Sequence, residues 1–244
     1  MHAVIMAGGK GVRLRPYTTA LPKPLMPIGE RHAILDIVLE QLAARGFTSV
    51  TLAINHLGPL IRAFTGTGAR WGMDIGYVEE TVPLSTAGPL FLIKDELPEH
   101  FLVMNGDLLT DLDYAGLLGE HRISGAPLTI ATAAQTTRME FGVLDVIDGK
   151  VVGFTEKPAY RHRVSMGVYG MARKALEPYP PGLSLGFDKL VQDLLRQGQF
   201  PNSYDFDGLW LDIGRPEEYD EANRRFAELE PALLPVRADS GVAA

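Results

Sequence analysis

Apolar runs alternate with helical patterns along the first 107 residues, and this alternation constrains the fold more than any other feature of the sequence. Short and nearly continuous apolar runs predict buried strands at residues 2–6, 49–54, 74–80 and 101–107. Apolar residues at helical spacing predict helices at residues 33–46, 59–66 and 86–97. This order is typical of a parallel sheet with helices on both faces, which binds its ligands at the carboxyl ends of the strands.

The second half of the chain has a different pattern, in which short strands follow one another closely. Strands are predicted at residues 128–133, 141–146, 151–158, 163–171 and 207–214, and helices at residues 187–198 and from Pro216 onward. No linker separates the two halves, so we expect one Rossmann-like α/β domain over residues 1–229. Its mixed, mostly parallel sheet would be flanked by helices. Residues 230–244 lose periodicity toward their end and are expected to form a C-terminal tail.

Composition excludes several classes of function. The formal net charge of −7 argues against a general nucleic-acid binder, because affinity for a phosphate backbone needs a basic surface. The chain has no cysteine, which excludes disulfides, thiol nucleophiles and zinc–thiolate sites. No apolar stretch is long enough for a membrane span, and the N-terminus lacks the pattern of a signal peptide. We therefore expect a cytoplasmic protein with no membrane or nucleic-acid partner.

A glycine-rich basic loop, "MAGGKGVRLRPYT" (residues 6–18), follows the first strand. Its glycines allow several backbone N–H groups to converge on phosphate oxygens. The loop lacks the Walker sequence, and Arg13 stands where a dinucleotide fingerprint needs its third glycine. A proline-rich segment with a single lysine, Lys23, follows at once. Arg13 and Lys23 therefore indicate two cations that contact one phosphate chain.

Two aspartates end apolar runs in this sequence. Asp107 closes the strand-like "FLVMNGD", and Asp212 closes an apolar stretch in "WLDIGRPEEY". Carboxylates at neighbouring strand ends can share Mg²⁺, which prefers few carboxylates together with phosphate oxygens. For Asp107 alone, a turn or a helix cap is the commoner interpretation.

Other polar groups are less informative by themselves. Glu156 and Lys157 precede a proline and would ordinarily form a solvated surface pair. Residues 160–163, Tyr-Arg-His-Arg, are interpreted as a wet basic loop. The six histidines show no metal-ligand spacing, and the sequence contains no serine-hydrolase elbow.

The motifs together resemble the sugar-nucleotidyltransferases, also called NDP-sugar pyrophosphorylases. The resemblance covers about residues 3–226 and rests, in family order, on "AGGKGVRLRPYT", "LPKPLMPIGE", "TAGPL", "NGDLLTD", "FGVL", "EKP", "SMGVY" and "WLDIGRPEEY". It implies that a nucleoside triphosphate and a sugar 1-phosphate give an NDP-sugar and pyrophosphate, with Mg²⁺ as cofactor. It also implies a nucleotide-binding half at about residues 1–110 and a sugar-phosphate-binding half at about residues 111–229.

The resemblance assigns roles to residues at matching positions. On the nucleotide side, Ala7, Gly8 and Gly9 would contact the nucleotide, Gly11 would shape the loop, Arg13 would bind the departing phosphates, and Lys23 the α-phosphate. Asp107 and Asp212 would ligate Mg²⁺, so the catalytic set is Arg13, Lys23 and Asp107. On the sugar side, Lys157 would bind the phosphate, Glu156 the hydroxyls, and Gly142 would approach through its backbone. Ser165 and Asp212 would also belong to the sugar-phosphate side, and Ser165 lies near a position where many relatives carry asparagine.

The base and the sugar are implied less closely. Glu80 begins "ETVPLSTAGPL", a pattern similar to GDP-mannose pyrophosphorylases that also brings Thr86, Ala87 and Gly88 to the nucleotide. A carboxylate at position 80 can accept from two N–H groups of guanine, which favours GTP over UTP or dTTP. GDP-mannose enzymes usually add a C-terminal β-helix, and this sequence ends before one. The sugar, among mannose, heptose and cyclitol types, stays open.

Three other expectations accompany this one. A uridylyl- or thymidylyltransferase of the same family is the main alternative. A catalytically silent subunit that binds NDP-sugars is less favoured, because the cations and acids of the motifs are all present. A nicotinamide oxidoreductase is disfavoured by the failed fingerprint. The oligomeric state is open, with a homodimer as one expectation.

Overall fold

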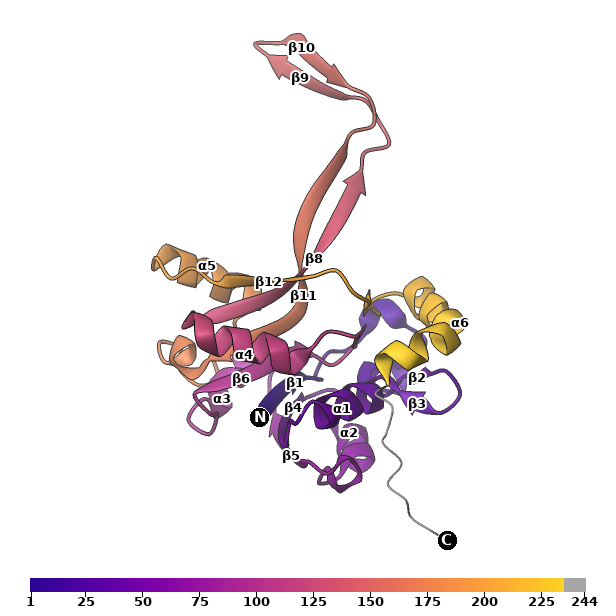
Figure 1. Cartoon of the computed structure of the whole chain (residues 1–244), viewed down its shortest axis with the longest axis vertical. Helices are drawn as coiled ribbons and strands as arrows, with labels where there is room; N and C mark the ends of the chain where they lie inside the picture. Colours follow the sequence, from indigo (N-terminus) through magenta and orange to yellow (C-terminus); the bar gives the residue numbers. More distant parts are fainter. Residues whose placement is uncertain (235–244) are drawn as a thin grey trace.

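A seven-stranded mixed sheet forms the centre of the computed structural model, which describes residues 1–234 (Figure 1). The strands lie in the order β12 (Asn202–Phe206), β8 (Leu128–Arg138), β11 (Ala159–Ala172), β6 (His100–Asn105), β1 (His2–Met6), β4 (Ser49–Ile54) and β5 (Asp74–Glu79). All neighbouring strands are parallel except β11, which runs antiparallel to both β6 and β8. The mixed, mostly parallel α/β sheet expected from the sequence is therefore confirmed.

Helices cover both faces of this sheet because successive side chains of a strand point to opposite sides. One face packs on α1 (Ile34–Ala44), α2 (Gly58–Thr65) and α4 (Tyr114–Ser124), through a cluster that contains Ile5 and Val38. The other face packs on α3 (Gly88–Ile93) and α5 (Phe187–Arg196), through a cluster that contains Val4 and Leu190. A third cluster joins α6 (Pro216–Leu233) to α1. Three apolar clusters thus join the central sheet and its helices into one layered unit, which we call the body.

Three short antiparallel pairs complete the described chain. They are β2 (Pro27–Ile28) with β3 (His32–Ala33), β7 (Leu108–Thr110) with β13 (Trp210–Asp212), and β9 (Val143–Ile147) with β10 (Lys150–Thr155). In the second pair, Asp212 lies opposite Leu108, the residue that follows Asp107. This pairing carries residues from the end of the chain to the carboxyl edge of the central sheet.

Residues 134–164, which we call the arm, stand away from the body (Figure 1). Here β8 and β11 continue beyond the sheet as a two-stranded ladder, in which Arg138 pairs with Ala159 and Thr132 with Ser165 at its root. The β9–β10 hairpin forms the outer end of the arm, and its two strands pair only with each other. Most arm side chains between Ala134 and Arg163 are exposed.

The structure differs from the sequence expectations in several elements. Residues 160–163 belong to β11 and are not a loop, because the polar ends of β8 and β11 pair with each other in the open. The helix expected at residues 86–97 is shorter, and β7, β12 and α4 were not predicted. The tail begins later than residue 230, since α6 continues to Leu233, which is buried; residues 235–244 lie outside the described residues. None of the helices among residues 1–234 is long and apolar enough to cross a membrane.

Candidate active site

The glycine-rich loop leaves the carboxyl end of β1 and is held by its own backbone and by Thr18. The N–H of Ala7 donates to the carbonyl of Ala53 at 2.8 Å, which continues the pairing of β1 with β4. Gly11 adopts φ +58°, and its carbonyl accepts a hydrogen bond from the Thr18 hydroxyl at 2.7 Å. An added Cβ at Gly11 would lie 2.8 Å from the Thr18 methyl group. Glycine is therefore needed there for the turn, as the sequence indicated.

Lys23 and Asp107 form a partly buried ion pair below this loop. Lys23 begins a short 3₁₀ turn (Lys23–Leu25). It lies between Pro22 and Pro24, whose rings restrict the backbone on both sides of the lysine. Its side chain is 9% exposed, and its ammonium group contacts Oδ2 of Asp107. Oδ1 of Asp107 is buried and has no hydrogen-bond partner among the described residues. A buried carboxylate oxygen without a donor is suited to a cation.

Asp212 lies beside Asp107, as expected from the two strand ends. Partial burial, and then the negative charge of Asp107, raise the pKa of the Asp212 carboxyl group, while Lys23 opposes the shift. Arg13 also approaches this corner, since an added Cβ at Gly214 would lie 3.4 Å from Nη2 of Arg13. Two cations and two carboxylates, from four separate segments of the chain, therefore lie close together.

A cleft of about 260 Å³ opens above this cluster. It is lined by Met6, Ala7, Gly9, Gly11, Val12, Arg13, Lys23, Pro24, Asp107 and Gly214. Two positive side chains and the glycine-rich backbone line one small space, which suits the phosphate chain of a nucleotide.

A second cleft, of about 480 Å³, adjoins the first and shares Met6, Gly9 and Asp107 with it. It is further lined by Gly8, Lys10, Ala53, Asn55, Glu80, Pro83, Ser85, Thr86, Pro89 and Asn105. This cleft is larger and more apolar, as expected for a cavity that holds a base and a ribose.

Glu80 lies in the second cleft beside Gly8, and a backbone hydrogen bond holds its side chain. Its Oε2 accepts a hydrogen bond from the N–H of Leu84 at 2.8 Å, and an added Cβ at Gly8 would lie 2.9 Å from its Oε1. Burial raises the pKa of the Glu80 carboxyl group, and the hydrogen bond from Leu84 opposes this effect. One carboxylate oxygen is thus already engaged by the backbone, while each oxygen has a second lone pair for a ligand.

The three residues of the "TAG" motif have different environments. Thr86 lines the second cleft, and its hydroxyl accepts from the N–H of Phe187 at 3.0 Å. Ala87 is fully buried, and Gly88 packs against Leu84; the N–H groups of Ala87 and Gly88 both donate to the carbonyl of Leu185. Ala87 and Gly88 therefore hold the backbone next to Thr86, and only Thr86 of the three lines the cleft.

The residues expected on the sugar side lie mainly on the arm, away from the two clefts. Glu156 and Lys157 are exposed at the turn between β10 and β11, and Lys157 has φ +42°. An added Cβ at Gly142 would lie 3.2 Å from Oε2 of Glu156, so these two positions are neighbours. Ser165, at the root of the arm, donates to the Tyr169 hydroxyl at 3.1 Å. The structure thus brings Gly142 and Glu156 together but leaves them outside the clefts.

Asn55, Asn105 and Glu218 also contribute to the site but were missed in the sequence. Asn55 and Asn105 stand at the carboxyl ends of β4 and β6 and line the second cleft. Glu218, in the first turn of α6, accepts from the N–H of Gly214 at 2.7 Å. The strand-end position of the two asparagines was the available signal; the contact of Glu218 depends on tertiary packing.

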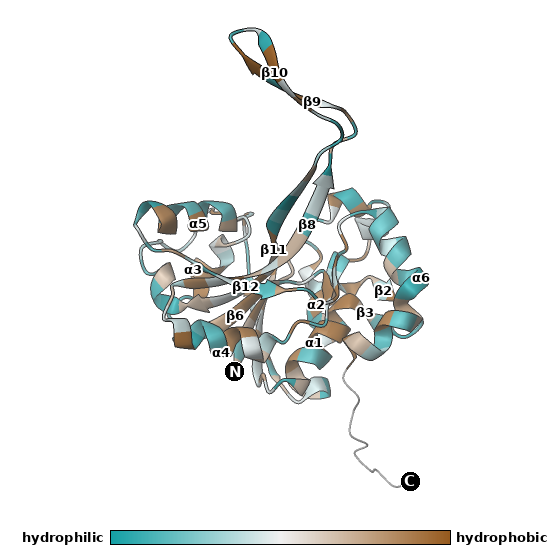
Figure 2. Ribbon diagram, turned by 45° about the horizontal axis from the view of Figure 1, so that its top comes forward, coloured by the Kyte–Doolittle hydropathy of each residue, from teal (hydrophilic) through white to brown (hydrophobic). Residues whose placement is uncertain are grey.

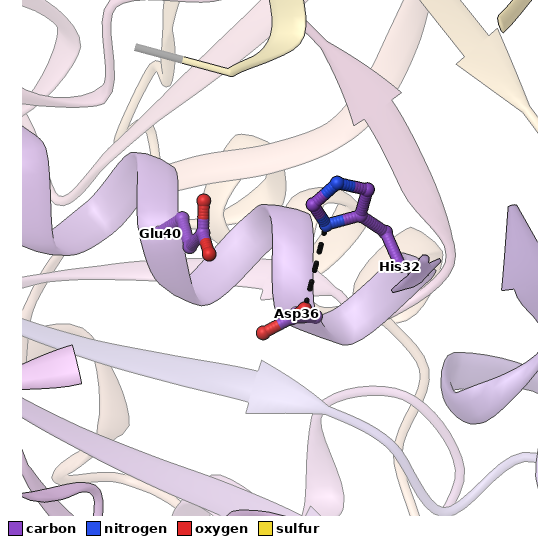
Figure 3. Close-up of side chains that lie close together, drawn as sticks. All are labelled: His32, Asp36 and Glu40. Atoms are coloured by element: carbon purple, nitrogen blue, oxygen red, sulfur yellow. Dashed lines mark ion pairs between the residues drawn. The ribbon is translucent and has the colours of Figure 1, made fainter. Parts of the chain in front are cut away.

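A second cluster lies at the start of α1, where His32 of β3 is close to Asp36 and Glu40 of α1 (Figure 3). The buried carboxylate of Asp36 accepts from Arg70 at 3.0 Å and from the Trp71 ring N–H at 3.1 Å. Because Arg70 already neutralises Asp36, we assign no metal to this cluster.

The chain is similar to known proteins over most of its length. The model of the Nucleotidyl transferase family matches residues 2–228. The chain is 33% identical over 231 residues to a mannose-1-phosphate guanyltransferase of Schizosaccharomyces pombe, covering 90% of this chain and 62% of that protein. It is also 33% identical over 245 residues to a UTP–glucose-1-phosphate uridylyltransferase of Synechocystis, covering 92% and 63%. The chain therefore spans somewhat less than two thirds of these relatives.

Solved structures share the fold. HddC from Yersinia pseudotuberculosis, complexed with GMP-PN, superposes with a TM-score of 0.70 at 23% identity, covering 92% of this chain and 99% of that one. At this identity the similarity shows the architecture alone.

Proposed function

Because the chain belongs to the nucleotidyl transferase family, we propose that it transfers a nucleoside monophosphate from a nucleoside triphosphate to a sugar 1-phosphate. A phosphate oxygen of the sugar 1-phosphate attacks the α-phosphorus of the triphosphate, a new P–O bond forms, and the bond to pyrophosphate breaks. The observation that carries the proposal is the cluster of Arg13, Lys23, Asp107 and Asp212 beneath a glycine-rich loop. Such a reaction needs positioning and charge neutralisation rather than a protein nucleophile.

The cations of the first cleft have separate tasks in this reaction. Lys23, fixed by its ion pair with Asp107, would contact the α-phosphate, where negative charge is present throughout the transfer. Arg13 lies at the Gly214 side of the cleft and would bind the β- and γ-phosphates as they leave. Backbone N–H groups of Gly8 and Gly9 would hold the remaining phosphate oxygens. Rigid donors of this kind stabilise charge without reorganisation during the reaction.

The residues present also fit a magnesium ion. Oδ1 of Asp107 is buried without a donor among the described residues, and the Asp212 carboxylate lies close enough for Asp107 to raise its pKa. Asp107 and Asp212 would hold the ion, which when bound supplies positive charge to the phosphate oxygens. Few protein carboxylates together with substrate phosphates form the usual Mg²⁺ environment.

For the base, the site favours guanine. Glu80 presents a half-buried carboxylate to the second cleft, and guanine offers two adjacent N–H donors that uracil and thymine lack. The Schizosaccharomyces pombe relative is named a guanyltransferase, which agrees with GTP. The Synechocystis relative is named as a uridylyltransferase at the same identity, so UTP is the second candidate. The acceptor is proposed as a sugar 1-phosphate of the mannose, heptose or cyclitol type.

The test is a pyrophosphate-release assay with Mg²⁺, each of five nucleoside triphosphates and a panel of sugar 1-phosphates. We expect release only when both substrates are present, and the fastest release with GTP. Fastest release with UTP would contradict the guanine assignment while leaving the reaction class in place. No release with any pair would contradict the proposed function itself.

A further inference from the structure

The outer hairpin of the arm exposes an apolar face that nothing in the described chain covers. The register of β9 and β10 pairs Leu144 with Phe154 and Val146 with Val151, which places these four side chains on one face. Each is more than half exposed, from 52% for Leu144 to 63% for Phe154. Figure 2 shows the brown, hydrophobic segments at this end of the arm. An isolated two-stranded hairpin is marginal in water, so such a face indicates a docking surface.

The arm also carries Glu156 and Lys157, which the family resemblance assigns to the sugar 1-phosphate. Gly167, at its root, lies beside the second cleft, because an added Cβ there would be 2.6 Å from Nδ2 of Asn105. From Ser165 outward, β11 pairs with β8 without interruption as far as Ala159. These six residue steps span about 20 Å at the usual rise per residue. Lys157 lies beyond that point, between the end of β10 and the start of β11, and the β9–β10 hairpin stands away from the body (Figure 1). A continuous hydrogen-bonded ladder thus keeps Lys157 away from the cleft of its own chain.

We propose that the arm docks on a second copy of this chain and brings Glu156 and Lys157 to the sugar-phosphate side of that copy's cleft. This inference rests on the proposed function and on the acceptor-side roles that the family resemblance implies for those two residues. In a twofold dimer each arm would reach the other subunit, so two clefts would be completed by exchange of two identical arms. The apolar face of the hairpin would be buried in the same contact.

Charge supports a second copy as the occupant. The arm contains five Lys or Arg and four Asp or Glu, a net charge of +1, whereas the whole chain carries −7. The rest of the chain therefore carries −8, so two bodies repel each other while an arm is attracted to the opposite body. Self-association through the arms combines this attraction with burial of the apolar face.

The first part of the test is the oligomeric state in solution. Sedimentation equilibrium should show a dimer for the wild-type chain and a monomer for the double variant Leu144→Lys, Phe154→Lys. Ile123→Lys, at an apolar side chain 89% exposed on α4, is the control and should remain dimeric. Circular dichroism of all three proteins checks that the body is folded. A monomeric wild-type protein would overturn the proposal.

The second part is complementation between two inactive subunits. Asp107→Asn and Lys157→Ala are co-expressed with different tags, and the mixed dimer is purified through both tags in sequence. One cleft of this dimer keeps Asp107 and receives Lys157 from its partner, so about half of wild-type activity is expected. An inactive mixed dimer would show that each arm serves its own cleft and would overturn the inference, although active wild-type enzyme would still support the proposed function. Inactive wild-type enzyme would instead contradict the proposed function.

Discussion

The ammonium group of Lys23 contacts Oδ2 of Asp107, while Oδ1 of the same carboxylate is buried without a hydrogen-bond partner among residues 1–234. The carboxylate therefore has two different sides, one neutralised by the protein and one available to a cation. Asp212 adds a second carboxylate beside it, and burial together with the charge of Asp107 raises the pKa of Asp212. These contacts support the proposal that a cation and a phosphate chain bind here.

The Asp107→Asn variant should lose turnover by roughly 100-fold or more, because an amide is a poor ligand for Mg²⁺ and carries no charge. The amide keeps an oxygen that accepts from Lys23, so the fold should be retained. The measurement is kcat for pyrophosphate release over a range of Mg²⁺ concentrations. Asp74→Asn, an exposed aspartate at the start of β5 and outside both clefts, is the matched control. Near-normal activity of Asp107→Asn would refute the metal assignment.

The Glu80→Gln variant should lose kcat/KM for GTP by about 10-fold or more and for UTP by much less. Glutamine keeps an oxygen for the N–H of Leu84, so the loop is retained, but only one acceptor oxygen remains for the two donors of guanine. Glu79→Gln, at the neighbouring exposed residue that pairs with Arg62, is the control and should affect neither substrate. Equal losses for GTP and UTP would remove the argument for guanine.

The Gly11→Ala variant should lower the free energy of unfolding by about 1–3 kcal/mol, because alanine is strained at φ +58° and its Cβ would meet the Thr18 side chain. Gly9→Ala in the same loop meets no atom within 4 Å and should leave stability unchanged. Urea denaturation of both variants measures the difference. Equal stability of the two would show that the loop tolerates a side chain at position 11.

The structure also predicts a loss of stability in mild acid. Burial, and then the charge of His100, lower the pKa of His121 to about 4. The unfolded chain, with a histidine pKa near 6.5, binds the proton more readily, so stability present above pH 6.5 is lost as the pH falls toward 4. The loss assigned to this residue is about 2–3 kcal/mol.

Urea denaturation from pH 7.5 to pH 4.5 measures this effect. His121→Gln and His121→Asn remove the titrating group, and the less destabilising of the two serves for comparison. The stability of that variant should fall less steeply with pH than the stability of the wild-type protein. Parallel curves would contradict the assignment to His121.

The sequence predicted the body of this fold well because its signals are local. Apolar runs such as residues 2–6 and 101–107 form buried central strands, whose carboxyl ends share one edge of the sheet. That geometry is the reason that the order of apolar runs predicts ligand binding at this edge of the sheet, where Asp107 lies. Asp212 was placed beside it by the same reasoning, and the pairing of β7 with β13 provides the contact.

The two-stranded ladder of the arm could not be predicted from the sequence in the same way, although the strands of its outer hairpin were expected. The outer parts of β8 and β11 are polar, as in "QTTR" and "YRHR", so they lack the alternation that marks a half-buried strand. They pair because each satisfies the backbone groups of the other. The contacts of Glu80 with Leu84 and of Glu218 with Gly214 depend on how the loops pack, which no spacing in the sequence encodes.

The most direct test of the central claim follows the oxygen atoms of the reaction. A sugar 1-phosphate with ¹⁸O at its three non-bridging positions is incubated with GTP, Mg²⁺ and the enzyme. The products are then separated, and their masses are measured by mass spectrometry. Attack of the sugar phosphate on the α-phosphorus predicts that all the label remains in the NDP-sugar and that the pyrophosphate is unlabelled. Label in pyrophosphate or in inorganic phosphate, or the release of inorganic phosphate in place of pyrophosphate, would contradict nucleotidyl transfer at this site.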